Sequence, residues 1–230
     1  MNKIFRVLKE NWIKYGFETV VVTVGLLGAF ALEGWRESRK EEKELLEIYQ
    51  TISNDLQSDA LALDTILDTY EWRIDKMEQL VKGSVTVDDW LINDSMFSAF
   101  TGYMDFQESL RGLDLLKLRI AASGETGNLA GRIIDFYNVR LLRTSVKKSE
   151  VDNFLYDNYD YWIHNTHWFS EAFADEDLSS LASYAMDNPI FRNRITAYLL
   201  VFEGYHYYLG IYKDEGRKLA EEINAFLEAK

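Results

Sequence analysis

The sequence predicts an all-α protein in which an N-terminal transmembrane helix is followed by an elongated antiparallel helical bundle. Three observations lead to this fold class. Residues 19–32 contain no charged side chain, although the chain as a whole has a formal net charge of -13. Beyond residue 44, apolar residues recur at steps of three and four, the period of a helix with one buried face. No segment alternates apolar and polar residues convincingly, as a half-buried strand would. The predicted parts are a basic amphipathic segment over 1–14, a transmembrane helix over 15–35 and an extramembrane helical bundle over 36–230.

The apolar segment is long enough to cross a bilayer when its aromatic flanks are included. As a helix, residues 15–35 would extend roughly 30 Å, at about 1.5 Å per residue. Glu18 and Glu33 would then lie near the two head-group regions, where a carboxylate stays hydrated. Trp12 and Trp35 occupy the positions at which aromatic side chains anchor a span at the membrane interfaces.

Two other interpretations of this segment stay open. A signal peptide would have a basic leader and a small-x-small cleavage site such as Ala29-Phe30-Ala31. A core helix of a soluble protein can have a similar length and composition.

Basic residues flank the apolar segment on both sides, and their balance slightly favours a cytoplasmic N-terminus. In a bacterium this orientation places an inner-membrane protein with its C-terminal domain in the periplasm. The basic residues are Lys3, Arg6, Lys9 and Lys14 before the span and Arg36, Arg39, Lys40 and Lys43 after it.

Small residues within the span predict helix association. Gly25 and Ala29 lie four residues apart, and Gly28 lies beside Ala29. Small residues at this spacing let two helix backbones approach closely, which is how helices associate inside a lipid bilayer. The expected partner is another protein or a second copy of the chain. Glycine is also common in membrane helices that do not associate.

The extramembrane part divides into helices at glycine, proline and polar turns. Residues 37–82 contain neither Gly nor Pro and carry a continuous apolar stripe, which predicts one long helix ending at Gly83. Thr86 to Asp89 offers a capping start for the next helix, and Pro189 favours the first turn of the last one. The further helices are expected over 86–100, 105–123, 129–170 with a bend at 144–150, 178–186 and 189–227.

Composition excludes several classes of function. The chain contains no cysteine, which removes disulfides, thiolate catalysis and sulfur-ligated metals. Its acidic charge argues against a nucleic-acid partner, because binding phosphates needs a basic face. Paired carboxylates such as Asp88-Asp89 and Glu221-Glu222 lie in capping or solvated contexts. We therefore predict no catalytic residue and no cofactor.

His164 and His167 form the one candidate metal cluster. They lie three residues apart on a predicted helix, with Asp160 and Glu171 about a turn away. Such a group can ligate zinc or another divalent metal, which makes a metal-dependent enzyme the third hypothesis. The surrounding aromatic residues suit a packed layer with histidines at its edge better, so we predict no metal site. His206 lies among tyrosines and is interpreted as a core or interfacial residue.

Aromatic residues concentrate late in the chain, over 156–173 and 198–212. They would either pack on each other in the core or leave some rings exposed to bind a protein, since tyrosine and tryptophan dominate such surfaces. A cavity lined by them would instead suit a periplasmic ligand-binding or sensor bundle, the second hypothesis. The candidate interaction residues are Trp162, Trp168, Tyr205 and Tyr208.

Two N-terminal motifs carry a family resemblance. Phe17-Glu18 precedes a valine-rich run, and Trp35 is followed by Arg36-Glu37-Ser38-Arg39-Lys40. These motifs resemble a bacterial family of uncharacterised single-span proteins, in which a glycine usually stands at Phe17 and an asparagine at Gly34. The resemblance implies a membrane-anchored helical protein of unknown function and no catalytic residues. It continues at 106–110, 133–137 and 188–193.

The span, the long helix that follows it and the lack of catalytic motifs favour one hypothesis over the other two. We expect a non-enzymatic, membrane-anchored helical protein that acts by association. It would be an accessory or scaffold subunit of an inner-membrane complex, or a homo-oligomer.

Overall fold

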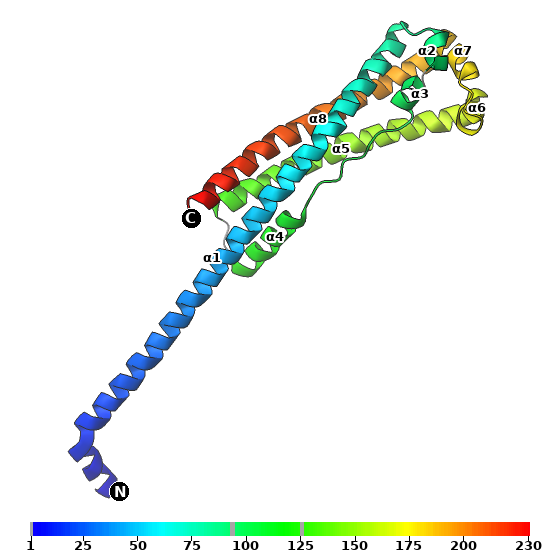
Figure 1. The fold of residues 1–230 in the computed structure, drawn as a ribbon. Helices are drawn as coiled ribbons and strands as arrows, with labels where there is room; N and C mark the ends of the chain where they lie inside the picture. Colours follow the sequence, from blue (N-terminus) through cyan, green and yellow to red (C-terminus); the bar gives the residue numbers. More distant parts are fainter. Residues whose placement is uncertain (1, 93–94, 125–126) are drawn as a thin grey trace. The chain divides into compact units, whose positions relative to one another are not determined.

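The computed structural model describes residues 2–92, 95–124 and 127–230, with side chains over 16–90, 96–122, 124 and 127–230. Within these residues every regular element is an α-helix, which confirms the predicted all-α class (Figure 1). The chain divides into two units, an N-terminal unit (Met1–Ile48) and a bundle unit (Tyr49–Lys230).

Helix α1 (Asn2–Lys82) begins in the N-terminal unit and ends in the bundle unit. It contains no proline, so no residue interrupts the backbone hydrogen bonds along the helix. Gly83 ends the helix with a φ of +68°, a left-handed conformation that a residue without Cβ adopts with little strain. The predicted helix end at this glycine is confirmed.

Two short helices, α2 (Val87–Ile92) and α3 (Ser95–Phe100), follow α1. Thr86 donates hydrogen bonds from its backbone N–H and its hydroxyl to the Asp89 carboxylate, both at 2.7 Å. These bonds cap the start of α2, as the sequence predicts. Residues 101–110, which we call the return segment, then run back beside α1 without regular secondary structure (Figure 1).

The predicted start of the third helix at residue 105 was wrong, because α4 (Arg111–Ser123) begins only after the return segment. The backbone N–H of Ser109 donates to both carboxylate oxygens of Asp59 on α1, each at 3.1 Å. Phe106 is buried in the core. These long-range contacts hold the segment extended against α1, so its backbone donor does not need a helical partner.

Helix α5 (Asn128–Asn165) is continuous through residues 144–150, where a bend was predicted. The polar side chains there pair within the helix, as the 2.7 Å contact between Lys147 and Glu150 shows. Pairs at this spacing support a helix, so a polar patch was no signal of a break.

Helix α5 ends at Asn165, well before the predicted end near residue 170. Thr166 has an extended backbone, and α6 (Trp168–Ala174) starts a new direction. The break brings the ring of Trp168 within 5.4 Å of the ring of Trp162. Packing of these two tilted rings on each other, which one continuous helix would not permit, accounts for the turn.

Helices α7 (Ser179–Asp187) and α8 (Pro189–Glu228) complete the chain. The Asn188 side chain accepts hydrogen bonds from the backbone N–H groups of Ile190 at 2.8 Å and Phe191 at 3.2 Å. This cap, with proline in the first turn, starts the last helix where the sequence predicts it.

In the bundle unit, α8 runs antiparallel to α5 and to the last part of α1 (Figure 1). The rings of Tyr49 and Phe226 lie 5.6 Å apart, and those of Tyr70 and Phe202 lie 4.6 Å apart. Later residues of α1 therefore meet earlier residues of α8. Because α5 is also antiparallel to α8, α1 and α5 run in the same direction. The predicted antiparallel bundle is confirmed, and α1 and α5 are parallel to each other within it.

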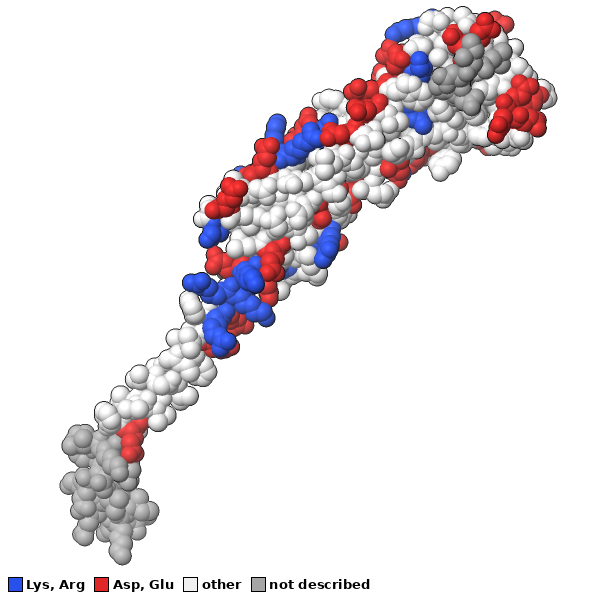
Figure 2. Space-filling view, viewed as in Figure 1, with Lys and Arg blue, Asp and Glu red and all other residues white. Residues whose placement is uncertain are grey.

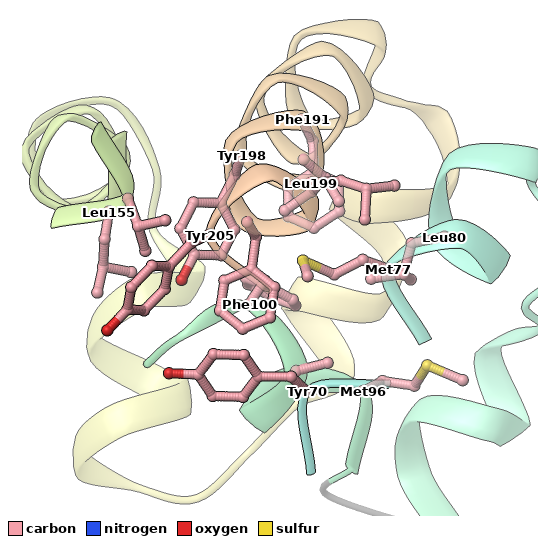
Figure 3. Close-up of a cluster of buried hydrophobic side chains, with 14 of the residues drawn as sticks. Tyr70, Met77, Leu80, Met96, Phe100, Leu155, Phe191, Tyr198, Leu199 and Tyr205 are labelled. Atoms are coloured by element: carbon pink, nitrogen blue, oxygen red, sulfur yellow. The ribbon is translucent and has the colours of Figure 1, made fainter. Parts of the chain in front are cut away.

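Large aromatic side chains fill the core of the bundle unit. Figure 3 shows Tyr70 of α1, Phe100 of α3, Leu155 of α5 and Tyr205 of α8 converging. The largest fully buried side chains include Trp90, Trp162, Trp168, Tyr70, Tyr137, Tyr198, Tyr205, Tyr212, Phe100, Phe191 and Phe202.

Candidate association surfaces

The apolar segment of the N-terminal unit is not buried by the part of the chain that the structure describes. Every residue from Gly16 to Glu44 is exposed, and Figure 2 shows the uncharged part of α1 as a white stretch. Helix α1 is long and apolar enough here to cross a membrane, and none of the apolar window is buried. A continuous apolar surface of this size marks an interaction with lipid or with protein.

The small residues of this segment are open to a neighbouring helix. Gly25, Gly28 and Ala29 are all exposed. A Cβ added at either glycine would meet no atom of this chain within 4 Å. Their role in helix association stays a prediction.

Trp35 is 57% exposed at the end of the apolar segment. The guanidinium carbon of Arg39, one turn later, lies 5.0 Å from the centre of its indole ring. This cation–π contact keeps the ring on the helix surface. Trp12 and the other side chains of the predicted basic segment 1–14 lie outside the described residues, so interfacial anchoring stays a prediction.

The prediction of exposed interaction aromatics was wrong for three of the four candidates. Trp162, Trp168 and Tyr205 are at most 2% exposed, so they are not available to a partner. The prediction that these rings pack in the core applies instead. Trp162 packs edge to face on Phe100 of α3, as does Phe191 of α8, and Trp168 of α6 packs on Trp162. Only Tyr208 is partly exposed.

Tyr208 belongs to an open groove between α5 and α8. Its hydroxyl accepts a hydrogen bond from the Arg143 guanidinium at 3.3 Å, and the guanidinium carbon lies 5.8 Å from the ring centre. The groove surface is mostly apolar, and two basic residues are among those that line it. Its lining residues are Asn138, Val139, Leu142, Arg143, Val146, Lys147 and Tyr208.

The histidine pair does not lie on one helix, contrary to the prediction. His164 is in the last turn of α5, and His167 immediately precedes α6. The Nδ1 atom of His164 lies 2.8 Å from the carbonyl oxygen of Asp160 and 3.5 Å from its carboxylate. Over the described part of the chain, no three His, Asp or Glu side chains are grouped to hold a metal ion. The metal hypothesis therefore has no third ligand among them.

His206 is half-buried on α8, with its Nε2 atom 4.0 Å from the Glu71 carboxylate. Burial lowers the pKa of this imidazole, against the attraction of the carboxylate. A neutral, partly covered histidine agrees with its interpretation as an interfacial residue.

Two charged residues of α1 organise the return segment and were not singled out from the sequence. Arg73 donates to the carbonyl oxygens of Ser98 and Gly102, where the end of α3 favours a cation. Asp59 is buried and, besides binding Ser109, accepts a hydrogen bond from the Tyr212 hydroxyl at 2.8 Å. Asp59 lies three residues after Leu56 and four before Leu63, and Arg73 lies three after Tyr70 and four before Met77, so both fall on the buried side of α1. A charge at a stripe position was the signal that could have found them.

Part of the chain matches a known protein family. Residues 18–108 match the model of a family of unknown function, DUF6090. The match begins just before the apolar segment and ends within the return segment, so it contains both Asp59 and Arg73. No curated protein and no solved structure matches the chain. Within this range the predicted resemblance to an uncharacterised family is confirmed. The resemblances noted at 133–137 and 188–193 lie outside it. Over residues 18–108 the chain thus carries the sequence pattern of the DUF6090 family.

Proposed function

We propose that this protein is a single-span membrane protein that acts by association and not by catalysis. It would serve as an accessory or scaffold subunit of an inner-membrane complex, or form a homo-oligomer. The observation that carries the proposal is the apolar segment of α1, which is exposed throughout and is not buried by any described residue.

A bilayer is the cover that fits this segment best. Apolar side chains surround the helix on all sides, which suits lipid, whereas a partner protein would cover only one face. Glu18, Glu33 and Trp35 stand at its two ends, where hydrated and aromatic groups favour the membrane interfaces. The basic residues at the N-terminus support a cytoplasmic start and a periplasmic bundle unit.

Association within the membrane would use the small residues. Gly25, Gly28 and Ala29 give the span a surface on which a second helix can approach without meeting a side chain of this chain. The same surface serves a different membrane subunit or a second copy.

A non-catalytic role agrees with how two charged groups of α1 are used. Half-buried Arg73 bonds to backbone carbonyl oxygens at the end of α3 and in the return segment, and buried Asp59 bonds to the backbone of Ser109 and to the core Tyr212. These bonds join α1 to other elements of the bundle unit, so both groups have a structural role.

The test is purification of the full chain from its native membrane in a mild detergent, with the mass in solution and the identity of bound proteins measured. We expect either a stoichiometric partner or a defined oligomer. Changing Gly25→Leu together with Gly28→Leu should reduce the bound fraction, because large side chains separate the helices.

Gly34→Leu is the matched control. It lies on the same helix, is exposed and has equal free space around it, but it stands at the end of the span, beyond Glu33 and outside the uncharged run 19–32. A chain that is monomeric with nothing bound would contradict the proposal and favour the ligand-sensing hypothesis.

A further inference from the structure

The groove between α5 and α8 has an ordered apolar lining. Val139, Leu142 and Val146 are 44%, 66% and 47% exposed and follow one another at steps of three and four. They therefore form a stripe along α5. Tyr208 of α8 lines the same groove, and the ring of Tyr207, itself 63% exposed, lies 5.4 Å from it. Contiguous exposed apolar side chains of this kind mark an interaction surface.

The shape of the groove suits a helix. Two antiparallel helices leave a long furrow between them, and a third helix can place its own apolar stripe there. Gly204 of α8 lies beside the lining residue Lys147, since a Cβ at that glycine would lie 3.6 Å from the Lys147 aliphatic chain.

The positive charge of the groove residues Arg143 and Lys147 favours a partner that carries carboxylates. Arg143 is held beside the groove by its hydrogen bond to Tyr208, and Lys147 stands one turn further along α5. Lys147 also pairs with Glu150 at 2.7 Å, which leaves Arg143 as the stronger attraction for an added carboxylate. The groove lining contains two basic residues and no acidic one, although the chain is strongly acidic overall.

A second copy of the chain fits this surface poorly. In a two-fold symmetric dimer the same patch meets itself, so Arg143 of each copy would face basic residues of the other. Like charges brought together at an interface disfavour a complex. The charge pattern therefore favours a different protein with carboxylates beside its apolar stripe.

We propose that the α5–α8 groove binds an amphipathic helix of another protein, with apolar residues at steps of three and four and Asp or Glu flanking them. This inference rests on the proposed associating function and names the class of partner. The apolar stripe would pack on Val139, Leu142 and Val146, and a flanking carboxylate would bind Arg143.

The test places a photo-crosslinking amino acid at Leu142 of the full chain in its native host, followed by mass spectrometry of the crosslinked peptides. We expect one dominant peptide from another protein, with the acidic amphipathic pattern described. Leu118 of α4 is the matched control position, because it is 69% exposed against 66% for Leu142. Crosslinks to this chain itself, to lipid, or to the same peptides from position 118 would each overturn the proposal.

A charge reversal gives the second readout. In the Leu142 crosslinking background, Arg143→Glu with Lys147→Glu should lower the yield of that peptide at least about fivefold, because carboxylates would then repel the partner. Lys117→Glu on the exposed side of α4 should leave the yield unchanged. An equal yield after the double reversal would contradict the proposal. If the charge reversal fails in this way but a partner still copurifies with the full chain, the groove inference is wrong while the proposed association through the span stands.

Discussion

Helix α1 contains two apolar regions that differ in how their side chains are arranged. Residues 19–32 are apolar on every side of the helix, and all of them are exposed. Residues 49–80 are apolar along one stripe, and that stripe is buried against the bundle. One continuous helix therefore contains two surface patterns that suit different surroundings. A helix that is apolar all round needs an apolar surrounding, whereas a striped helix needs protein on one side and water on the other.

The largest expected effect comes from placing charge in the first region. Val22→Arg with Leu26→Arg should release the protein from the membrane fraction, because two arginines near the middle of a span cost about 5 kcal/mol or more. The measurement is retention in membranes after an alkaline wash. Leu61→Arg, at a position of the second region that is 69% exposed, should be retained. Equal retention of the natural chain, the double arginine variant and Leu61→Arg would contradict the assigned difference between the two regions.

In the second region, the buried and exposed sides of α1 should differ sharply. Tyr70→Ala should lower the free energy of unfolding of the bundle unit by about 3–5 kcal/mol, because it removes a ring packed 4.6 Å from Phe202 and leaves a cavity. Trp72→Ala, two residues away and 37% exposed, should cost under about 1.5 kcal/mol. Denaturant unfolding followed by circular dichroism compares them, and similar losses would argue against the assigned stripe.

Two glycines of the bundle unit test how closely helices pack: Gly112 is tightly packed against α1, whereas Gly210 has free space around it. A Cβ at Gly112 of α4 would lie 2.8 Å from the backbone nitrogen of Ile52, so Gly112→Ala should force α4 away from α1 at a cost of about 1–3 kcal/mol. Gly210 of α8 has no atom within 4 Å of an added Cβ. Gly210→Ala should therefore stabilise the helix by about 1 kcal/mol. Changes of the same sign in thermal unfolding would refute the close approach of α4.

The smallest expected effect depends on pH. Burial raises the pKa of the Asp55 carboxyl, and the charge of Asp59 adds to this, while the hydrogen bond from the Gly112 N–H and the charge of Arg111 act against it. The folded state thus binds this proton more tightly than the unfolded chain. The resulting stability is present below about pH 4 and is lost as the pH rises through the folded pKa.

Asp55→Asn keeps an oxygen for the Gly112 N–H, which the carboxylate binds at 2.7 Å, but removes the ionisation. Relative to the natural chain, the variant should become more stable as the pH rises from 4 to 7. Unfolding midpoints across this range measure the difference. A relative loss of stability with rising pH would contradict the assigned direction of the pKa shift.

The helices that local signals define were predictable from the sequence. Gly83, Thr86 with Asp89, and Asn188 with Pro189 mark helix ends through backbone conformation or capping within a few residues. The apolar segment was equally visible, because its composition alone distinguishes it.

The errors occurred where distant residues decide the conformation. Residues 105–110 have a helical apolar pattern but stay extended because Asp59 binds the Ser109 backbone across the bundle. The break after Asn165 depends on the packing of Trp168 against Trp162, and the burial of both rings removed them as surface candidates. The groove around Leu142 was not predictable either, since it needs the placement of α5 beside α8.

The absence of cysteine makes a direct test of the membrane span possible. Single cysteines at Leu26, Ser38 and Ser58, all exposed in this chain, would be treated with a membrane-impermeant maleimide in intact spheroplasts. The proposal predicts labelling at residues 38 and 58 and none at residue 26 until the membrane is dissolved and the chain denatured. Equal labelling at all three positions in intact spheroplasts would contradict the claim that a bilayer covers the apolar segment of α1.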